Sequence, residues 1–339
     1  MIAALFRRIV LAPVVIALTT LMWTAIPFWL IGTGFAASFV PRWLRPVRLI
    51  WVMVLHLTLE SIILVDLLGL WIRRPWFERV HYDIVQAYLV VFFREARRVL
   101  RVKVETIGPS PAAFPGEPLL VCCRHAGPGD SFLLMYALMH WYGREPRVVL
   151  KDTLAWDPAV GILLHRLPSR FVRPNPGVGE DVESQIADLA RNLDENDAFV
   201  IFPEGGNFTP KRRARAITRL RRLGMERMAR RAERMKHVLA PKPGGLLAAL
   251  AAAPEADVLL VAHTGMDHVL TLRDVWHSLP MDKQISMGWW RVPRAEIPTG
   301  HDDQIEWLFD WWQLIDDWVE EHRPTDLPRA QFSRTRQQA

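Results

Sequence analysis

The sequence predicts an α/β fold, a sheet covered by helices, preceded by two apolar helices that anchor the chain in a membrane. Three observations predict it. Two long apolar stretches occupy the first 72 residues, strand-like runs alternate with helix-like stretches from about residue 100 onward, and no internal repeat interrupts this alternation. Such alternation is typical of a sheet whose faces are packed with helices.

The two apolar stretches predict the membrane anchor. Residues 9–40 contain no charged side chain, and residues 49–72 carry only His56, Glu60 and Asp66 as ionisable groups. About 20 apolar residues span a bilayer. A cleaved signal peptide is the competing interpretation, but its apolar core is shorter. Arginines flank both stretches, so two full crossings and two helices that dip into one leaflet both fit. We expect the three ionisable groups to face another helix or water, because polar groups are costly in lipid.

The remainder of the chain has the pattern of a folded domain. The expected strands lie at 101–106, 119–123, 147–150, 170–173, 198–202 and 257–262, and the expected helices at 84–99, 131–142, 158–167, 182–193, 246–253 and 304–321. The predicted organisation is therefore membrane-anchoring helices at 1–78, a main domain at 79–323 and a flexible tail at 324–339.

Composition narrows the class of protein. With 50% hydrophobic and 23% charged residues, the chain is not disordered. The only cysteines, Cys122 and Cys123, are adjacent in an apolar run, which indicates neither a disulfide framework nor a zinc site. Buried free cysteines fit a main domain that faces a reducing cytosol.

The positive charge is local. The chain carries a net charge of +6, yet residues 211–237 alone contain twelve Lys or Arg and two Glu. Apolar residues recur there at helical spacing, which predicts a basic amphipathic helix broken near Gly224. Such a helix can lie on an anionic membrane, attract an anionic ligand or simply pack on the domain. No aromatic residues are interleaved for stacking on bases, so nucleic-acid binding is not expected.

Two loops that follow apolar strands carry side chains suited to chemistry. His125 and Asp130 flank a Gly-Pro-Gly turn. An imidazole can accept a proton near neutral pH, and a nearby carboxylate can orient it; the alternative is that Asp130 only caps a helix. In Phe202-Pro-Glu-Gly-Gly, Glu204 can bond a hydroxyl and Gly205 permits close approach of a ligand. The alternative for this second loop is an ordinary turn.

Two other positions suit a phosphate. In Pro241-Lys-Pro-Gly-Gly245, Lys242 and the free N–H groups at a helix start, beside Gly244, favour an anion. Arg173, at the end of a short predicted strand, has forked donors that match phosphate oxygens. A plain helix entry and a solvated arginine are the respective alternatives.

The order of these motifs resembles that of the PlsC-type lysophospholipid acyltransferases, the 1-acylglycerol-3-phosphate acyltransferase family. That order is His-x4-Asp, a strand ending in Arg, Phe-Pro-Glu-Gly, and Lys-x-Gly before an apolar helix. Residues 237–245, and Glu296-Ile-Pro-Thr-Gly300 before a Trp-rich helix, are similar to the branch with lysocardiolipin acyltransferases. The chain departs from the family at Arg124, often Asn, and at Gly206, usually Thr; the Pro of the fourth family motif is replaced by Ala262.

The resemblance, over roughly residues 45–322, implies the glycerolipid acyltransferase fold, a mixed sheet flanked by helices. It implies transfer of a fatty acyl group from acyl-CoA or acyl carrier protein to the free hydroxyl of lysophosphatidic acid, giving phosphatidic acid. It further implies a membrane enzyme that needs no cofactor or metal and faces the cytoplasm, at the inner membrane if the source is bacterial. The implied base is His125 and its partner Asp130, and the implied acceptor-binding residues are Arg173, Glu204, Gly205, Lys242 and Gly244.

Two alternatives remain open. Within the enzyme class, the acceptor could be another lysophospholipid or a glycolipid. Outside it, the chain could be a non-catalytic protein that binds anionic lipid at the membrane surface through residues 211–237.

Overall fold

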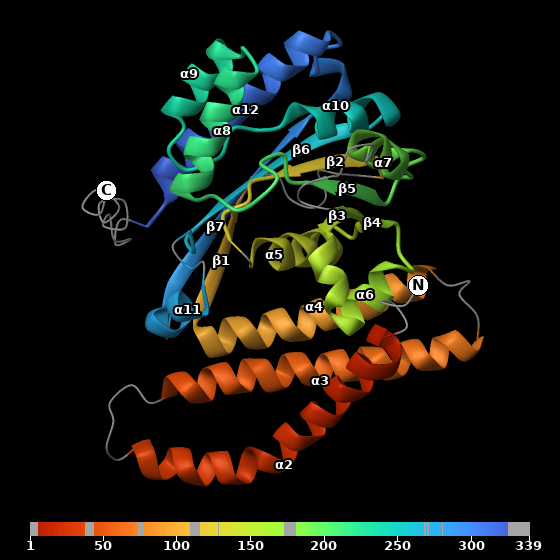
Figure 1. The fold of residues 1–339 in the computed structure, drawn as a ribbon, viewed down its shortest axis with the longest axis vertical. Helices are drawn as coiled ribbons and strands as arrows, with labels where there is room; N and C mark the ends of the chain where they lie inside the picture. Colours follow the sequence, from red (N-terminus) through yellow and green to blue (C-terminus); the bar gives the residue numbers. More distant parts are fainter. Residues whose placement is uncertain are drawn as a thin grey trace. The chain divides into compact units, whose positions relative to one another are not determined.

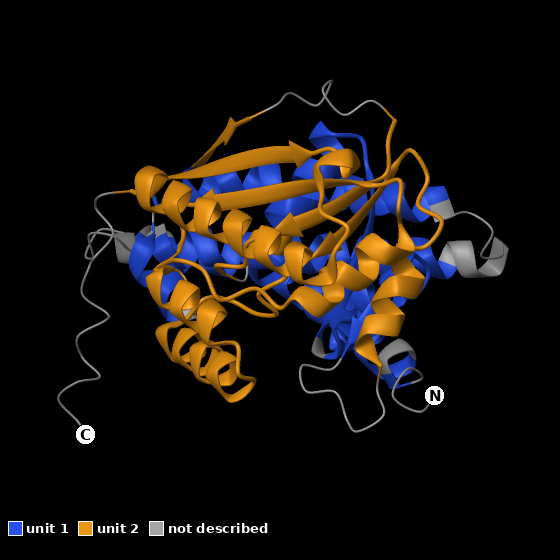
Figure 2. Ribbon diagram, turned by 90° about the horizontal axis from the view of Figure 1, so that it is seen from above, with its two compact units in different colours: residues 1–102, 132–180, 272–282 blue, residues 103–131, 181–271, 283–339 orange. Residues whose placement is uncertain are grey.

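The computed structural model describes residues 6–37, 44–73, 78–108, 116–127, 129–172, 181–267, 269, 271–279 and 281–324. The chain forms two compact units, one of residues 1–102, 132–180 and 272–282, the other of residues 103–131, 181–271 and 283–339 (Figure 2). The first unit thus combines the predicted anchor with parts of the predicted main domain. The predicted boundaries at 78 and 323 adjoin segments outside the described residues, and they stay predictions.

The first unit is mainly helical. Its elements are η1 (Arg7–Leu11), α2 (Ala12–Ala37), α3 (Leu44–Arg73), α4 (Glu78–Leu100), most of α5 (Asp130–Tyr136), η3 (Ala137–Trp141), β3 (Glu145–Lys151), η4 (Asp152–Trp156), α6 (Pro158–Leu164), β4 (Ser169–Val172) and α11 (Leu272–Ser278). Helix α3 packs against α2, α4 and α6 (Figure 1). Strands β3 and β4 pair in parallel.

Helices α2 and α3 are the two predicted apolar segments. Residues 9–33 and 45–68 are each long and apolar enough to cross a bilayer, judged by length and composition. Large apolar side chains of α2, among them Phe28, Ile31 and Phe35, are mostly exposed. Exposed apolar surface of this kind is typical of a lipid contact, and these observations favour membrane association.

Polar contacts join α2 to α3. The hydroxyls of Thr19 and Ser61 lie 2.9 Å apart, and the Trp23 indole N–H donates to the Thr58 hydroxyl at 2.9 Å. A hydrogen bond between apolar helices satisfies groups that lipid cannot solvate, so such contacts stabilise a helix pair in a bilayer.

The second unit contains a mixed sheet. Its elements are β1 (Val102–Ile107), β2 (Leu119–Cys123), α7 (Val182–Ala190), β5 (Asp197–Ile201), α8 (Pro210–Arg222), α9 (Glu226–Arg234), α10 (Pro243–Ala252), β6 (Asp257–Thr264), β7 (Lys283–Val292), η5 (Arg294–Glu296) and α12 (His301–His322). The strand order within this unit is β1-β7-β6-β2-β5. Strand β2 is parallel to β5 and β6, whereas β7 is antiparallel to β6. The predicted mixed α/β sheet is therefore confirmed.

The burial of the central strands explains their sequences. Every residue of β2, β5 and β6 is buried, which accounts for continuous apolar runs rather than alternation. In register, Val121 of β2 lies between Val200 of β5 and Leu259 of β6. Because the three strands run in the same direction, their carboxyl ends meet at one edge of the sheet (Figure 1). Ligands of open α/β sheets bind at this edge.

Helix α12 packs on β6 and α10 and completes the core of this unit. Phe309, Trp312 and Ile315 on its inner face are fully buried. Truncating one buried aromatic side chain to alanine typically costs about 3–5 kcal/mol. The predicted Trp-rich final helix is therefore part of the main fold.

The basic stretch forms two helices. Helix α8 ends at Arg222, and α9 begins at Glu226. Between them Gly224 has φ +74°, a left-handed conformation that favours glycine. The predicted break near Gly224 is confirmed.

Candidate active site

The His125–Asp130 loop follows β2. The ladder continues for one residue, with Arg124 N–H donating to Val261 O at 3.0 Å, and α5 then begins at Asp130. His125 Nδ1 lies 3.3 Å from Asp130 Oδ2. An ionised carboxylate only accepts, so Nδ1 carries the proton and Nε2 is left as the basic nitrogen. The turn thus brings the two predicted catalytic side chains together.

Asp130 is held in its ionised form. Burial alone would raise the pKa of this carboxyl, but His263, His125 and the Gly127 amide outweigh burial, and the pKa lies below its usual value. The Gly127 N–H donates to Asp130 Oδ2, and His263 Nε2 lies 3.5 Å from the same oxygen. Asp130 therefore contacts two imidazoles, of which the sequence analysis identified only one.

His263 was missed because the strand was expected to end at residue 262. Strand β6 continues to Thr264, which places the buried His263 side chain beside the end of β2. Its Nε2 also lies 3.1 Å from Arg124 O. A histidine at the carboxyl end of a buried strand adjoining β2 was the available signal.

The loop that begins at Phe202 is hydrogen-bonded to both the backbone C=O and the backbone N–H of His125. Phe208 N–H donates to His125 O at 2.9 Å, and His125 N–H donates to Glu204 Oε1 at 2.9 Å. The other carboxyl oxygen of Glu204 accepts from Leu239 N–H at 2.8 Å. Only 2% of Glu204 is exposed. These contacts make Glu204 a positioning residue for His125; its predicted bond to an acceptor hydroxyl stays a prediction.

The environment of Glu204 makes stability depend on pH. Burial raises the pKa of Glu204 to about 8, although Arg124 and the two amides act in the opposite direction. An unfolded Glu titrates near pH ~4.3. The native state therefore binds the extra proton, and this contribution to stability is complete below about pH 4 and is lost as pH rises through about 8.

We accordingly expect the urea midpoint of the wild type to fall between about pH 6 and 9, and Glu204→Gln, which cannot ionise, to lack this part of the decline. Glu255→Gln, at an exposed position, is the matched control and should follow the wild type. Equal slopes in all three proteins would contradict the protonated native carboxyl.

A cluster of cations lies over the loop Phe202-Pro-Glu-Gly-Gly206, called the glycine loop below. Gly205 has φ +67°, and a Cβ there would meet Lys242 Nζ at 2.7 Å, so the ammonium lies directly against the loop. The Arg212 guanidinium lies beside Gly206, where a Cβ would be 3.2 Å from Nη1. Burial, with Arg219 and Arg212 nearby, lowers the pKa of Lys242. Among the described residues, none of these three cations forms an ion pair, so the cluster is suited to an anion.

The structure thus unites Gly205 and Lys242, two of the predicted binding residues. It adds Arg212 and Arg219, which the sequence analysis counted only as part of the basic helix. A helical stretch of arginines does not reveal which of them points at a loop that lies before it in the chain.

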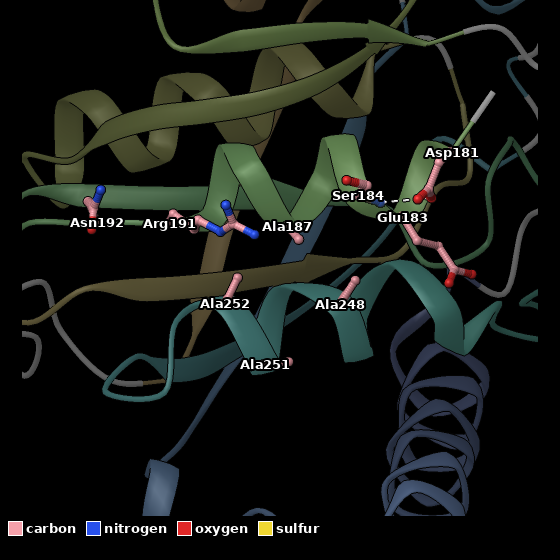
Figure 3. A pocket seen from close by; sticks show the side chains of 9 residues that line it. All are labelled: Asp181, Glu183, Ser184, Ala187, Arg191, Asn192, Ala248, Ala251 and Ala252. Carbon is pink, nitrogen blue, oxygen red and sulfur yellow. Dashed lines mark hydrogen bonds between the residues drawn. The ribbon is translucent and has the colours of Figure 1, made fainter. Parts of the chain in front are cut away.

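Gly244 has a different neighbour. A Cβ at Gly244 would collide with the Glu183 carboxylate, which projects from α7 toward the start of α10 (Figure 3). This carboxylate already complements the positive end of α10. A role of Gly244 in phosphate binding stays a prediction, and Arg173 lies outside the described residues.

A pocket lies between α7 and α10, and none of the predicted site residues lines it. Small and polar side chains line this hollow (Figure 3): Asp181, Glu183, Ser184, Ala187, Arg191, Asn192, Ala248, Ala251 and Ala252. Neither His125 nor Asp130 is among these lining residues.

Arg124 is a buried positioning residue. Its guanidinium pairs with Asp267 and donates to His263 O and, at 2.9 Å, to His237 O. Only 1% of Arg124 is exposed. Burial would lower its pKa, but Asp267 and Glu204 keep it above the usual value, and Arg124 in turn lowers the pKa of Asp267. This arginine ties the end of β2 to the segments after α9 and β6.

Comparison with known proteins bears on the identity of this domain. Residues 101–253 match the model of the Acyltransferase family. An uncharacterized acyltransferase of Schizosaccharomyces pombe is 22% identical over 188 residues, which are 51% of this chain and 51% of the relative. The chain thus spans about half the length of the curated relative that it matches.

A solved structure shares the fold. The 1-acyl-sn-glycerophosphate (LPA) acyltransferase PlsC from Thermotoga maritima superposes with a TM-score of 0.53 at 15% identity, over 82% of this chain and 97% of that one. The matched family region contains His125 and Asp130 at the edge of the sheet. Residues 101–253 are therefore similar to the Acyltransferase family, and the chain shares the fold of the PlsC acyltransferase.

Proposed function

We propose that the chain transfers a fatty acyl group from acyl-CoA or acyl carrier protein to the free hydroxyl of lysophosphatidic acid, giving phosphatidic acid. The observation that supports this most directly is the connection between two features. The loop of the His125–Asp130 pair is hydrogen-bonded to the glycine loop, over which Lys242 and Arg212 lie. An acceptor with a hydroxyl close to a phosphate matches a base close to such a cationic cluster.

The proposed reaction follows from the protonation state of His125. Nδ1–H donates to Asp130, and Nε2 removes the proton from the acceptor hydroxyl as its oxygen attacks the thioester carbonyl. The C–O bond forms, the C–S bond breaks, and the thiolate takes the proton from Nε2. Asp130 stabilises the imidazolium that exists between these steps. The acyl thioester is the only co-substrate in this scheme.

The apolar helices agree with an insoluble acceptor. Helices α2 and α3 have the length and composition of membrane spans, and we propose that they hold the enzyme at the membrane with its catalytic residues facing the cytoplasm, at the inner membrane if the source is bacterial. A lysophospholipid and an acyl chain partition into that membrane, so anchoring raises their local concentration.

A panel of acceptors tests the proposal. The full chain in detergent micelles is incubated with an acyl thioester and lysophosphatidic acid, other lysophospholipids or glycolipids, and products are measured by mass spectrometry. Phosphatidic acid as the main product supports the proposal. Preference for another lysophospholipid or a glycolipid would replace the proposed acceptor, and anionic-lipid binding without turnover would favour the non-catalytic alternative.

Removing a cation should affect acceptor binding more than chemistry. We expect Lys242→Met and Arg212→Gln each to raise KM for lysophosphatidic acid about 10- to 100-fold, with a smaller change in kcat, because a charge-assisted hydrogen bond contributes about 1.5–3 kcal/mol. Lys211→Met, at an exposed position in the same basic helix, is the control. A fall in kcat at unchanged KM would contradict phosphate binding by this cluster.

A further inference from the structure

A cluster of ionisable groups in the helical unit has no part in the mechanism above. His56 and Glu60 lie one turn apart on α3, with His56 Nε2 3.8 Å from Glu60 Oε2. Asp157 stands at the start of α6. One ligand atom from each of the three residues lies within 4.8 Å of the others.

The buried carboxyl of Glu60 lacks a full set of partners. Glu60 is 4% exposed, and its Oε1 has no hydrogen-bond partner. A ligand atom of Asp157 lies within 4.8 Å of one of Glu60. Two carboxylates this close repel each other, and an unpartnered buried oxygen costs about 1–3 kcal/mol. A cation between the two acids would offset their repulsion and give the free oxygen of Glu60 a partner.

The surrounding groups orient His56 and Asp157 for ligation. His56 Nδ1 is 3.0 Å from the Tyr88 hydroxyl, which leaves Nε2 directed to the acidic groups. Metal-bound histidines usually make such a bond through their second nitrogen. Asp157 Oδ1 accepts from Val160 N–H at 2.8 Å, which fixes the carboxyl and leaves its other oxygen available.

The Phe92 ring packs edge-on against His56, with centroids 5.9 Å apart. An apolar ring beside the cluster reduces screening by water, which strengthens the attraction of the two acids for a cation.

We propose that His56, Glu60 and Asp157 bind a divalent transition-metal cation that joins α3 to the start of α6. One imidazole and two carboxylates form a donor set that Zn²⁺, Mn²⁺ and Fe²⁺ accept, with further positions open to water. Metal–ligand distances are about 2.0–2.2 Å, so each ligand atom must move inward by about 0.5–1 Å on binding. None of the residues assigned to acyl transfer belongs to this donor set.

Metal analysis of the purified full chain tests this proposal without an activity assay. The protein in detergent is treated with chelator, incubated with Zn²⁺, freed of excess ion and analysed by mass spectrometry for zinc. We expect about one zinc per chain and an increase in Tm of about 2–4 °C relative to the chelated protein. Co²⁺ loaded in the same way should give visible d–d absorption from His and carboxylate ligands.

Isosteric variants assign the site. Glu60→Gln and Asp157→Asn should lose the zinc and the Tm increase; Asn can still cap α6, so the second variant should fold. Asp66→Asn removes a charge from an exposed position of the same helix and should retain both. No zinc in the wild type, or equal zinc in Glu60→Gln, would overturn the proposal and leave a shared proton between the two carboxyls.

Discussion

Replacing His125 with alanine is expected to lower kcat by about 10²–10⁴-fold, the usual contribution of a general base. The imidazole is the group whose Nδ1 is bound by Asp130, and its Nε2 is the proposed proton acceptor. KM for the acceptor should change little, because the cations over the glycine loop remain in place. Steady-state kinetics with lysophosphatidic acid and an acyl thioester measure both constants.

Two comparisons make this expectation specific. His301→Ala removes an exposed imidazole at the start of α12 and should retain wild-type kinetics. The circular dichroism of His125→Ala should match the wild type, because the backbone hydrogen bonds between His125 and the glycine loop remain. A kcat near that of the wild type would remove His125 as the base.

The second large effect concerns stability. Arg124→Met is expected to lower the free energy of unfolding by about 3–5 kcal/mol, because the variant leaves the Asp267 carboxylate without its counter-charge. Asp267 would lose its ion-pair partner. Urea denaturation monitored by tryptophan fluorescence measures this change.

The loss of stability in Arg124→Met should depend on pH. Arg124 lowers the pKa of Asp267, so the pair stabilises the native state above the ordinary pKa of an aspartate and loses this contribution as pH falls. Arg124→Met should therefore differ from the wild type most at neutral pH and least in acid. The exposed Arg98, paired with Glu95, provides the control Arg98→Met, which should leave stability nearly unchanged.

A double-mutant cycle separates the pair from simple loss of packing. If Arg124 acts through Asp267, Arg124→Met combined with Asp267→Asn should cost less than the sum of the two single changes. Strict additivity would contradict the ion pair as the cause.

The sequence predicted those helices and strands whose pattern depends on residues close together in the chain. Continuous apolar runs predicted β2 and β5, and the glycine at position 224 predicted the break between α8 and α9. The ten-residue strand β7 was missed, because Gly288 and the polar residues at its start weaken the strand pattern. Its antiparallel place beside β6 depends on a partner distant in sequence.

The residues of the candidate active site also divide into those that the sequence predicted and those that only the structure showed. His125 and Asp130 were identified because a single turn joins them, and the structure places them in contact. His263 and Arg212 were not, because His263 belongs to another strand and Arg212 to a helix after the glycine loop. No spacing along the chain encodes which of many histidines or arginines points toward His125 or Gly205.

By itself the sequence determined the α/β alternation, the two apolar helices and the residue types that acid–base chemistry requires. The tertiary structure alone decided that Glu204 bonds the backbone of His125, that Arg124 is buried against Asp267, and that Lys242 lies over Gly205. The physical reason is the distance along the chain between the residues that interact. Helix and strand patterns arise from neighbours along the chain, whereas burial and ion pairing depend on segments that only folding brings within a few ångströms.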